Sequence, residues 1–197
     1  RILRKKTEGT DDNYRANVKT SAIEYHTTSV RLPWEITEET LRENIEGQSL
    51  EGTITNLMTT QMGIDSEDLC LNGDESISPT DYDLLRINDG WVKQISNGGH
   101  VYDAQSGEMS LDLFYNALSQ LPNKYNNGKL RWLMSPRRAQ EWELFLLNKV
   151  IGAGGAVPDS LYTAPARIPT VECPSLSDKI ILLTDPQNLI NVNTYNV

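Results

Sequence analysis

The chain has 197 residues and a formal net charge of −9, with 38% hydrophobic and 23% charged residues. This composition is ordinary for a globular protein of one large or two small domains, and it excludes disorder throughout. The acidic balance argues against a nucleic-acid-binding protein, whose surface would be basic. The sequence has no apolar run of roughly 18 residues and no signal peptide in RILRKKTEGT, so it predicts no membrane-spanning helix and no secretory leader.

The first 33 residues predict an extended arm. Residues 21–32 favour a strand, and the polar segment 8–17 is typical of the tip of a long hairpin. A two-stranded hairpin of this kind is only marginally stable by itself in water. The arm therefore needs a partner surface.

Charge separates this arm from the residues that follow it. Up to Arg31 there are seven basic residues against four acids, whereas between Glu35 and Asp89 there are fourteen acids against two arginines. Such a distribution is typical either of solvated surfaces or of a basic arm that docks on the acidic body of a neighbouring subunit.

Residues 37–62 predict a long amphipathic helix. Thr37 suits the N-cap, and Glu38 and Glu39 place negative charge in the first turn, where the helix dipole favours it. Apolar residues recur at steps of three and four, and Gly63 predicts the helix end. Two glycines and four threonines weaken the intrinsic helix propensity, so the helix needs packing against another surface, within the chain or on a neighbouring chain.

The rest of the chain predicts an α+β fold. We expect a short helical turn at 65–74, a helix from Tyr82 to about residue 95, a turn at 97–99, helices at 110–121 and 136–150, strands at 129–135, 168–173 and 179–184, and a helical turn from Pro186.

Signals for catalysis are weak. The two histidines, His26 and His100, are isolated, no G-x-S-x-G is present, and neither Cys70 nor Cys173 lies in a recognisable nucleophile motif. The glycine-rich segment 152–155 follows a helix instead of opening one, unlike a phosphate-binding loop. We therefore expect no enzymatic activity and no cofactor. Two reduced thiols are favoured over one long-range disulfide.

An acidic cluster leaves a second hypothesis open. Asp65, Glu67, Asp68 and Asp74 are dense, and hard cations prefer oxygen ligands, although the spacing does not match an EF-hand loop. The alternative function is an acidic α+β enzyme or metal-dependent domain that uses the Asp65–Asp74 carboxylates. That alternative requires a concave site with convergent carboxylates, whereas a solvated acidic surface does not.

Several motifs in a fixed order resemble one known family. They are Met62-Gly63-Ile64-Asp65-x-Glu67-x-Leu69-x-Leu71-Asn72-Gly73-Asp74, Asp89-Gly90-Trp91-Val92-Lys93-Gln94-Ile95, the strand Leu130-Arg131-Trp132-Leu133-Met134-Ser135-Pro136 and the ending Leu182-Leu183-Thr184-Asp185-Pro186-x-Asn188-Leu189. From about Leu32 onward the chain resembles a major capsid protein of a tailed bacteriophage or prophage, with the HK97-type capsid fold.

The resemblance implies a domain organisation. Residues 1–33 would form the E-loop, 34–97 the peripheral (P) domain with its spine helix at 37–62, and 98–197 the axial (A) domain, with a central mixed sheet flanked by helices. An N-terminal arm before the E-loop and the closing strands of the P domain are missing, so we expect the chain to be truncated at both ends.

The resemblance also implies a function. The chain would be a structural head subunit that self-assembles into hexamers and pentamers of an icosahedral shell enclosing double-stranded DNA. Implied partners are other copies of the chain, a scaffold, a maturation protease and a portal. The implied location is the virion, after assembly in the bacterial host cytoplasm.

The candidate site residues are those of assembly, and none is catalytic, cofactor-binding or metal-binding. In the family the E-loop reaches over the P domain of the next subunit, so the basic arm would lie on the acidic helix. The candidates are Lys5, Lys6 and Arg15 on the arm and Glu38, Glu39, Glu43 and Glu46 on the helix.

Overall fold

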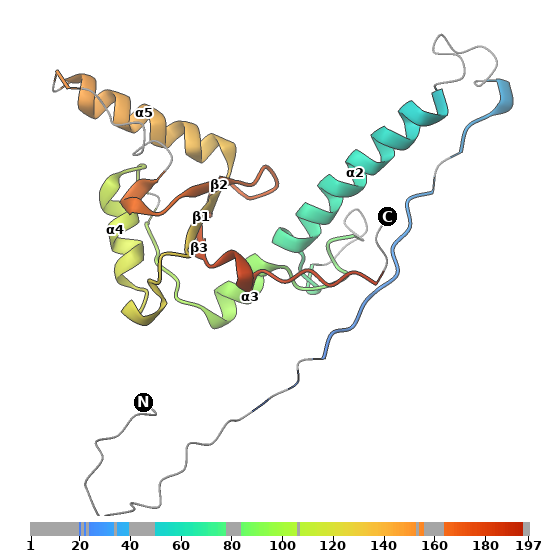
Figure 1. Ribbon diagram of the computed structural model, residues 1–197, viewed down its shortest axis with the longest axis horizontal. Coiled ribbons are helices and arrows are strands. Elements are labelled where there is room, and N and C mark those ends of the chain that lie inside the picture. The colour runs from blue at the N-terminus through green and yellow to red at the C-terminus, as the bar shows by residue number, and fades with distance from the viewer. Residues whose placement is uncertain are drawn as a thin grey trace, which may run out of the picture. The chain divides into compact units, whose positions relative to one another are not determined.

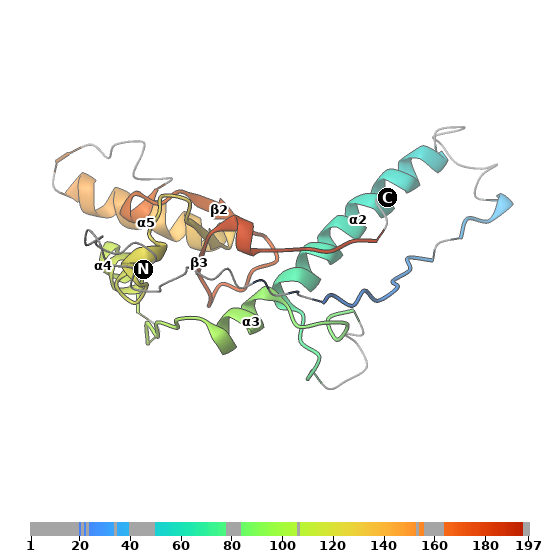
Figure 2. The same ribbon diagram turned by 60° about the horizontal axis from the view of Figure 1, so that its bottom comes forward.

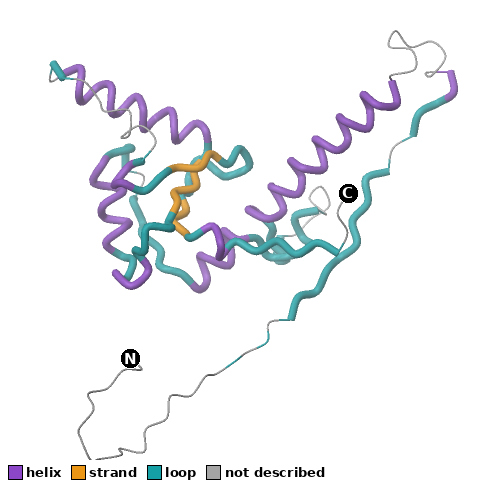
Figure 3. Tube along the Cα trace, viewed as in Figure 1, coloured by secondary structure: helices purple, strands orange, loops and turns teal. Residues whose placement is uncertain are grey.

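The computed structural model describes residues 20, 22, 24–33, 35–39, 50–77, 84–105, 107–152, 154–155 and 164–194. The chain divides into two compact units, residues 1–28 with 192–197 and residues 29–191. In the first unit, Thr194 Oγ1 donates a hydrogen bond to Thr27 Oγ1 at 3.3 Å. The helices and strands named below belong to the second unit, and Figure 3 distinguishes them by colour.

The described helices follow one another along the second unit. They are α2 (Leu50–Asn72), α3 (Trp91–Gly98), α4 (Leu111–Ser119) and α5 (Pro136–Gly152), with single turns of 3-10 helix at η2 (Asn123–Tyr125), η3 (Pro165–Arg167) and η4 (Pro186–Asn188). None of the helices in the described ranges has the length and hydropathy needed to cross a membrane.

A mixed sheet with the strand order β2-β1-β3 joins these helices. Its central strand β1 (Arg131–Met134) runs parallel to β2 (Thr170–Glu172) and antiparallel to β3 (Leu182–Thr184). The three strands lie within the ranges that the sequence predicts, and the α+β prediction is confirmed.

One face of the sheet packs against α4 and α5 (Figure 1). Trp132 and Met134 alternate with Leu133 along β1, so their side chains point to this face. Phe114 of α4 lies edge-on to Trp132 and to Trp142 of α5, with ring centroids 5.0 Å apart in both pairs. These large buried rings make this cluster the main core.

The opposite face packs against α3 and the C-terminal end of α2 (Figures 1 and 2). Leu133 of β1 and Leu182 of β3 are cross-strand partners, and they bury Leu71 of α2 together with Leu176. The half-buried apolar residues of α3 pack onto the same cluster. The C-terminal end of α2 is therefore fixed to the sheet.

The predicted end of the long helix at Gly63 is wrong. α2 continues through Gly63 to Asn72, so the helical turn expected at 65–74 is the last part of this helix. Gly63 is exposed, and its cost of about 1 kcal/mol relative to alanine is outweighed by the burial of Leu71. Residues 40–49, which include most of the predicted first half, lie outside the described residues.

The predicted helix from Tyr82 to about residue 95 is confirmed only in part. Residues 84–88 form turns and bends, whereas residues 91–95 are helical as part of α3, which begins at Trp91. Gly90 is the N-cap of α3 and is extended, with φ −72° and ψ 170°, as is usual for that position.

The predicted arm is only partly described. Residues 24–33 are exposed and carry no strand assignment, although the sequence favours a strand there. The proposed hairpin tip at 8–17 lies outside the described residues. The E-loop assignment therefore stays a prediction.

Candidate functional site

Two glycine motifs that are separate in sequence meet at the end of α2. The Gly90 N–H donates a hydrogen bond to the Gly73 carbonyl at 2.7 Å, and the Gly73 N–H caps α2 by donating to the Leu69 carbonyl at 3.0 Å. A Cβ on Gly90 would lie 2.6 Å from the Gly73 nitrogen, and one on Gly73 would lie 2.7 Å from the Leu69 oxygen. Only glycine fits this crossing. The motifs 72–74 and 89–95, on which the family resemblance depends, thus form one junction.

The side chain of Lys93 forms two ion pairs at this junction. Its Nζ lies 2.5 Å from Asp74 Oδ1 and 2.7 Å from Asp89 Oδ1. Hydrogen bonds from Lys93 and then Ser76 lower the pKa of Asp74 to about 2. Lys93 and then the Glu75 N–H lower the pKa of Asp89, and both carboxylates raise the pKa of Lys93, Asp74 more strongly. Lys93 therefore stabilises the charged form of both carboxylates, and they stabilise its charge, whereas the charge of Asp74 opposes ionisation of Asp89.

The last turns of α2 are also tied to the loop after β2. The Asn72 side-chain amide donates to the Ser175 carbonyl at 2.6 Å, and the Ser175 N–H donates to Glu67 Oε1 at 3.3 Å. Two polar side chains of α2 therefore satisfy the backbone of a turn more than 100 residues away.

Both cysteines lie near this region as free, half-buried thiols. Burial raises the pKa of Cys70. Burial, and then the negative charge of Glu67, raises the pKa of Cys173. Neither environment favours the reactive thiolate.

The acidic cluster does not form the convergent site that the metal hypothesis requires. Each carboxylate has its own partner: Asp65 accepts from Gln61, Asp68 from Asn72, Glu67 from Ser175 and Asp74 from Lys93 and Ser76. Among the described residues, no group of three His, Cys, Asp or Glu side chains could hold a metal ion.

A further polar contact fixes the start of α5. The buried hydroxyl of Ser135 donates to Asp178 Oδ1 at 2.5 Å and accepts from the Arg138 N–H at 3.3 Å. The Arg138 guanidinium binds the Asp178 carbonyl and the Glu141 carboxylate. The sequence predicts the helix at 136–150 but not the contact with Asp178, because no local signal links residues 43 apart.

The structure describes only two of the seven predicted assembly residues. Glu38 and Glu39 are exposed in a helical turn, and Glu38 has an interaction partner. The other five lie outside the described residues: Lys5, Lys6, Arg15, Glu43 and Glu46. The docking of the arm on the acidic helix stays a prediction.

An apolar row on α2 is partly uncovered. Leu50, Leu57, Ile64 and Leu71 are spaced by seven residues and therefore share one side of the helix. Leu71 is buried, but Leu57 and Ile64 are 61% and 51% exposed. Exposed apolar side chains that share one side of a long helix are typical of a surface that another chain or segment covers.

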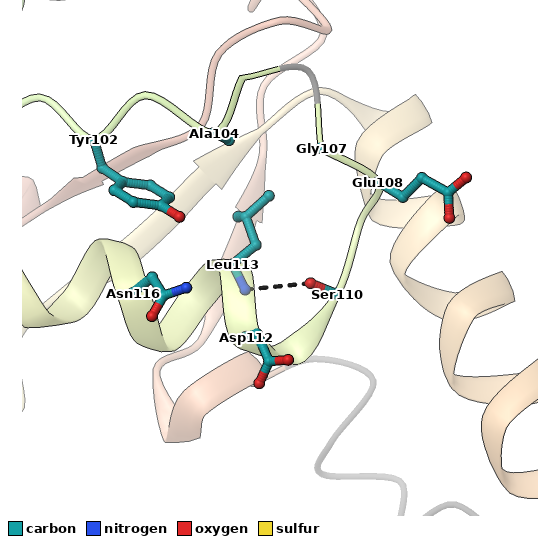
Figure 4. A pocket seen from close by; sticks show the side chains of 8 residues that line it. All are labelled: Tyr102, Ala104, Gly107, Glu108, Ser110, Asp112, Leu113 and Asn116. Carbon is teal, nitrogen blue, oxygen red and sulfur yellow. Dashed lines mark hydrogen bonds between the residues drawn. The ribbon is translucent and has the colours of Figure 1, made fainter.

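A small pocket lies beside the start of α4. It holds about 130 Å³ and is lined by Tyr102, Ala104, Gly107, Glu108, Ser110, Asp112, Leu113 and Asn116 (Figure 4). The Ser110 hydroxyl already accepts the Leu113 N–H as the N-cap of α4. Ligand sites for metabolites are usually roughly 300 to 1,000 Å³, so this pocket suits a single side chain.

The chain is similar to one protein of Bacillus subtilis (strain 168), "Putative prophage capsid protein YqbE". The two are 28% identical over 206 residues, which cover 96% of this chain and 65% of the relative. The chain thus spans about two thirds of the length of this relative. No family model matches the chain. No solved structure matches it either.

Proposed function

We propose that the chain is a structural subunit of a prophage capsid, with no catalytic role. The observation that carries this proposal is the similarity to the Bacillus subtilis protein, which extends over 96% of the chain. A capsid subunit acts by associating with its own copies, and it needs rigid folded parts that hold its contact surfaces in place.

Two features of the described residues support such a role. The junction at Gly73, Gly90 and Lys93 fixes the direction in which α2 leaves the sheet. The row that contains Leu57 and Ile64 leaves apolar surface for a partner. A long helix held at one end and uncovered along its side suits contact with neighbouring subunits.

The finer assignment follows the HK97-type pattern. The chain forms hexamers and pentamers of an icosahedral shell, with residues 1–33 as the E-loop, 34–97 as P-domain residues and 98–197 as the A domain. Within that organisation α2 contains the C-terminal part of the spine helix, and the mixed sheet belongs to the A domain. The shell encloses double-stranded DNA without reading its sequence, in keeping with the acidic net charge.

The remaining partners and the location follow from the same proposal. Assembly takes place in the cytoplasm of the bacterial host, and the finished subunit is part of the virion. A scaffold, a maturation protease and a portal are the further partners of such a head.

Docking of the basic arm on an acidic neighbour has its own test. Lys5→Glu combined with Lys6→Glu should weaken assembly at low salt, because attraction would become repulsion between exposed charges. Lys179→Glu combined with Lys149→Glu is a control with the same change in net charge, made at exposed lysines outside the arm. Assembly of the arm variant equal to that of the control would reject this docking.

The capsid role itself is tested by negative-stain electron microscopy of the whole reading frame that contains this chain. The full reading frame is needed because the chain spans only 65% of its relative. Closed shells, or free hexamers and pentamers, are the expected particles. Monodisperse monomers under all assembly conditions would reject the proposal.

A further inference from the structure

Opposite charges are segregated along the α4 region. Residues 98–119 contain the acids Asp103, Glu108 and Asp112 and no lysine or arginine. Residues 120–135 contain Lys124, Lys129 and Arg131 and no acid. All of these side chains except that of Arg131 are exposed. The unit therefore has a local negative and a local positive surface that adjoin along the chain.

The acidic surface includes an uncovered face of α4. Tyr115 of α4 is 51% exposed, and Tyr102 lies beside Asn116 of the same helix (Figure 4). The carboxylates of Glu108 and Asp112 point away from Tyr102, toward solvent. We call Tyr102, Glu108, Asp112, Tyr115 and Asn116 the α4 surface. It combines aromatic area with negative charge, a combination suited to binding a cationic partner.

The positive surface is the loop between α4 and β1. Lys124 and Lys129 are exposed there, and the Lys124 Nζ lies 4.5 Å from the ring centroid of Tyr125, which is itself 48% exposed. We call residues 122–130 the lysine loop. It too presents an aromatic ring beside a charge.

The two surfaces do not neutralise each other within one chain. Neither lysine of the loop and neither carboxylate of the α4 surface forms an ion pair with another described residue. The carboxylates of Glu108 and Asp112 lie at the start of α4 and the lysines lie beyond its end, and the helix itself is about 13 Å long at roughly 1.5 Å per residue. Each surface is therefore available to another molecule.

We propose that the lysine loop of one copy docks on the α4 surface of the next copy, and this inference rests on the proposed capsid function. Charge complementarity selects a second copy as the partner, because one chain carries both halves of the contact. A contact between two different surfaces of the same chain is heterologous, and it closes into a ring when the rotation between copies allows it. Copies with a net charge of −9 repel one another, so a contact that uses a local positive surface also offsets that repulsion.

The small pocket beside Tyr102 fits this contact better than it fits a metabolite. Its size suits one side chain, and two acidic residues, Glu108 and Asp112, are among those that line it. An anion at the start of α4 would meet Asp112, and the Ser110 hydroxyl there is already engaged. A lysine side chain from the neighbouring loop has the charge and dimensions for the site.

Charge reversal tests the contact in the product of the whole reading frame. One variant carries Lys124→Glu and Lys129→Glu, and a second carries Glu108→Lys and Asp112→Lys. A third carries all four changes. The control carries Lys149→Glu and Lys179→Glu, at exposed lysines outside both surfaces. Sedimentation velocity measures assembly at low and at high salt, and thermal unfolding verifies that each variant is folded.

We expect each double variant to need about tenfold or more higher protein concentration for assembly at low salt, because like charges would face each other. The fourfold variant should assemble as the wild type does, since its charges are again complementary. An equimolar mixture of the two double variants should also assemble, as hexamers that alternate the two, because only a ring with an even number of copies can alternate. The control should remain close to the wild type.

The outcomes separate this contact from the capsid role. If the wild type assembles and both double variants match the control, the capsid role stands and the proposed contact is wrong. If the double variants fail and neither the fourfold variant nor the mixture restores assembly, the pairing of these two surfaces is likewise wrong. A wild type that never assembles overturns both proposals.

Discussion

Gly90 donates its backbone N–H to the carbonyl of Gly73 at 2.7 Å, and the two residues are too close for a side chain on either. This contact brings the end of α2 against the start of α3. Sixteen residues lie between the two glycines in sequence, and six of them lie outside the described ranges. This backbone crossing therefore acts together with the burial of Leu71 to set the direction of α2 relative to the sheet.

Gly90→Ala should destabilise the protein. The added Cβ would lie 2.6 Å from the Gly73 nitrogen, so the crossing must open, at a cost of roughly 1–3 kcal/mol or more. Gly63→Ala is the matched control. Because Gly63 lies in α2 with nothing near its missing Cβ, alanine there should stabilise by up to about 1 kcal/mol. Urea unfolding measures both changes, and equal effects of the two substitutions would contradict the account of the junction.

Removing the charge of Asp74 should have an effect that depends on pH. The pKa of Asp74 is about 2 in the folded protein against an ordinary value of 3.8, so folding favours the charged form. Its contribution to stability is therefore complete above the ordinary value and is lost as the pH falls toward 2. Asp74→Asn should lower Tm by a constant amount at neutral pH, and the difference from the wild type should shrink in that acidic window.

The control for this titration is Glu143→Gln, which removes an exposed carboxylate of α5. Its Tm difference should be small at every pH. A Tm difference between Asp74→Asn and the wild type that grows as the pH falls would show that folding does not favour the charged form of Asp74.

Phe114→Ala should lower the free energy of unfolding more than any other substitution named in this section. Phe114 is fully buried between Trp132 and Trp142, both 5.0 Å from its ring, so truncation leaves a cavity between α4, α5 and the sheet. The expected loss is about 3–5 kcal/mol in the free energy of unfolding. Tyr115→Ala, on the exposed side of the same helix, should change it by only about 0.5 kcal/mol. If Phe114→Ala and Tyr115→Ala lower the free energy of unfolding equally, Phe114 is not part of the main core.

We expect that glycine at position 166, in the turn before β2, changes the stability of the protein very little. Ala166 has φ 53° and ψ 29°, a left-handed conformation that costs an alanine roughly 1–2 kcal/mol relative to the right-handed helix. Ala166→Gly removes this strain but also one buried methyl group, so the net change should be small. Ala139→Gly within α5 should destabilise by about 1 kcal/mol. Chemical denaturation compares the two, and the account fails if Ala166→Gly is the more damaging.

Elements with strong local signals could be predicted from the sequence. Ser110 opens the helix predicted at 110–121 and is the N-cap of α4, Pro136 opens α5 after the buried strand β1, and Asp185 with Pro186 starts the expected helical turn η4. In each case the residues that decide the structure are neighbours in sequence. Tertiary contacts were not needed to place them.

Features that depend on distant residues could not be predicted in the same way. Gly63 resembles a helix end, yet the helix continues because Leu71 is buried against Leu133 and Leu182. Lys93 belongs to the motif at 89–95 that resembles the capsid family. Its ion pair at the junction could not be predicted, because the partner Asp74 lies nineteen residues earlier. The carboxylates of residues 65–74 are close in sequence, but those on α2 point to different partners, and Asp74 follows the helix and pairs with Lys93.

The most direct test of the central claim is sedimentation of the product of the whole reading frame, with and without calcium. The capsid account predicts hexamers, pentamers or larger shells, and a thermal stability that calcium does not change. A stable monomer whose Tm rises with calcium would contradict the account. That result would favour the alternative in which the carboxylates of residues 65–74 bind a metal.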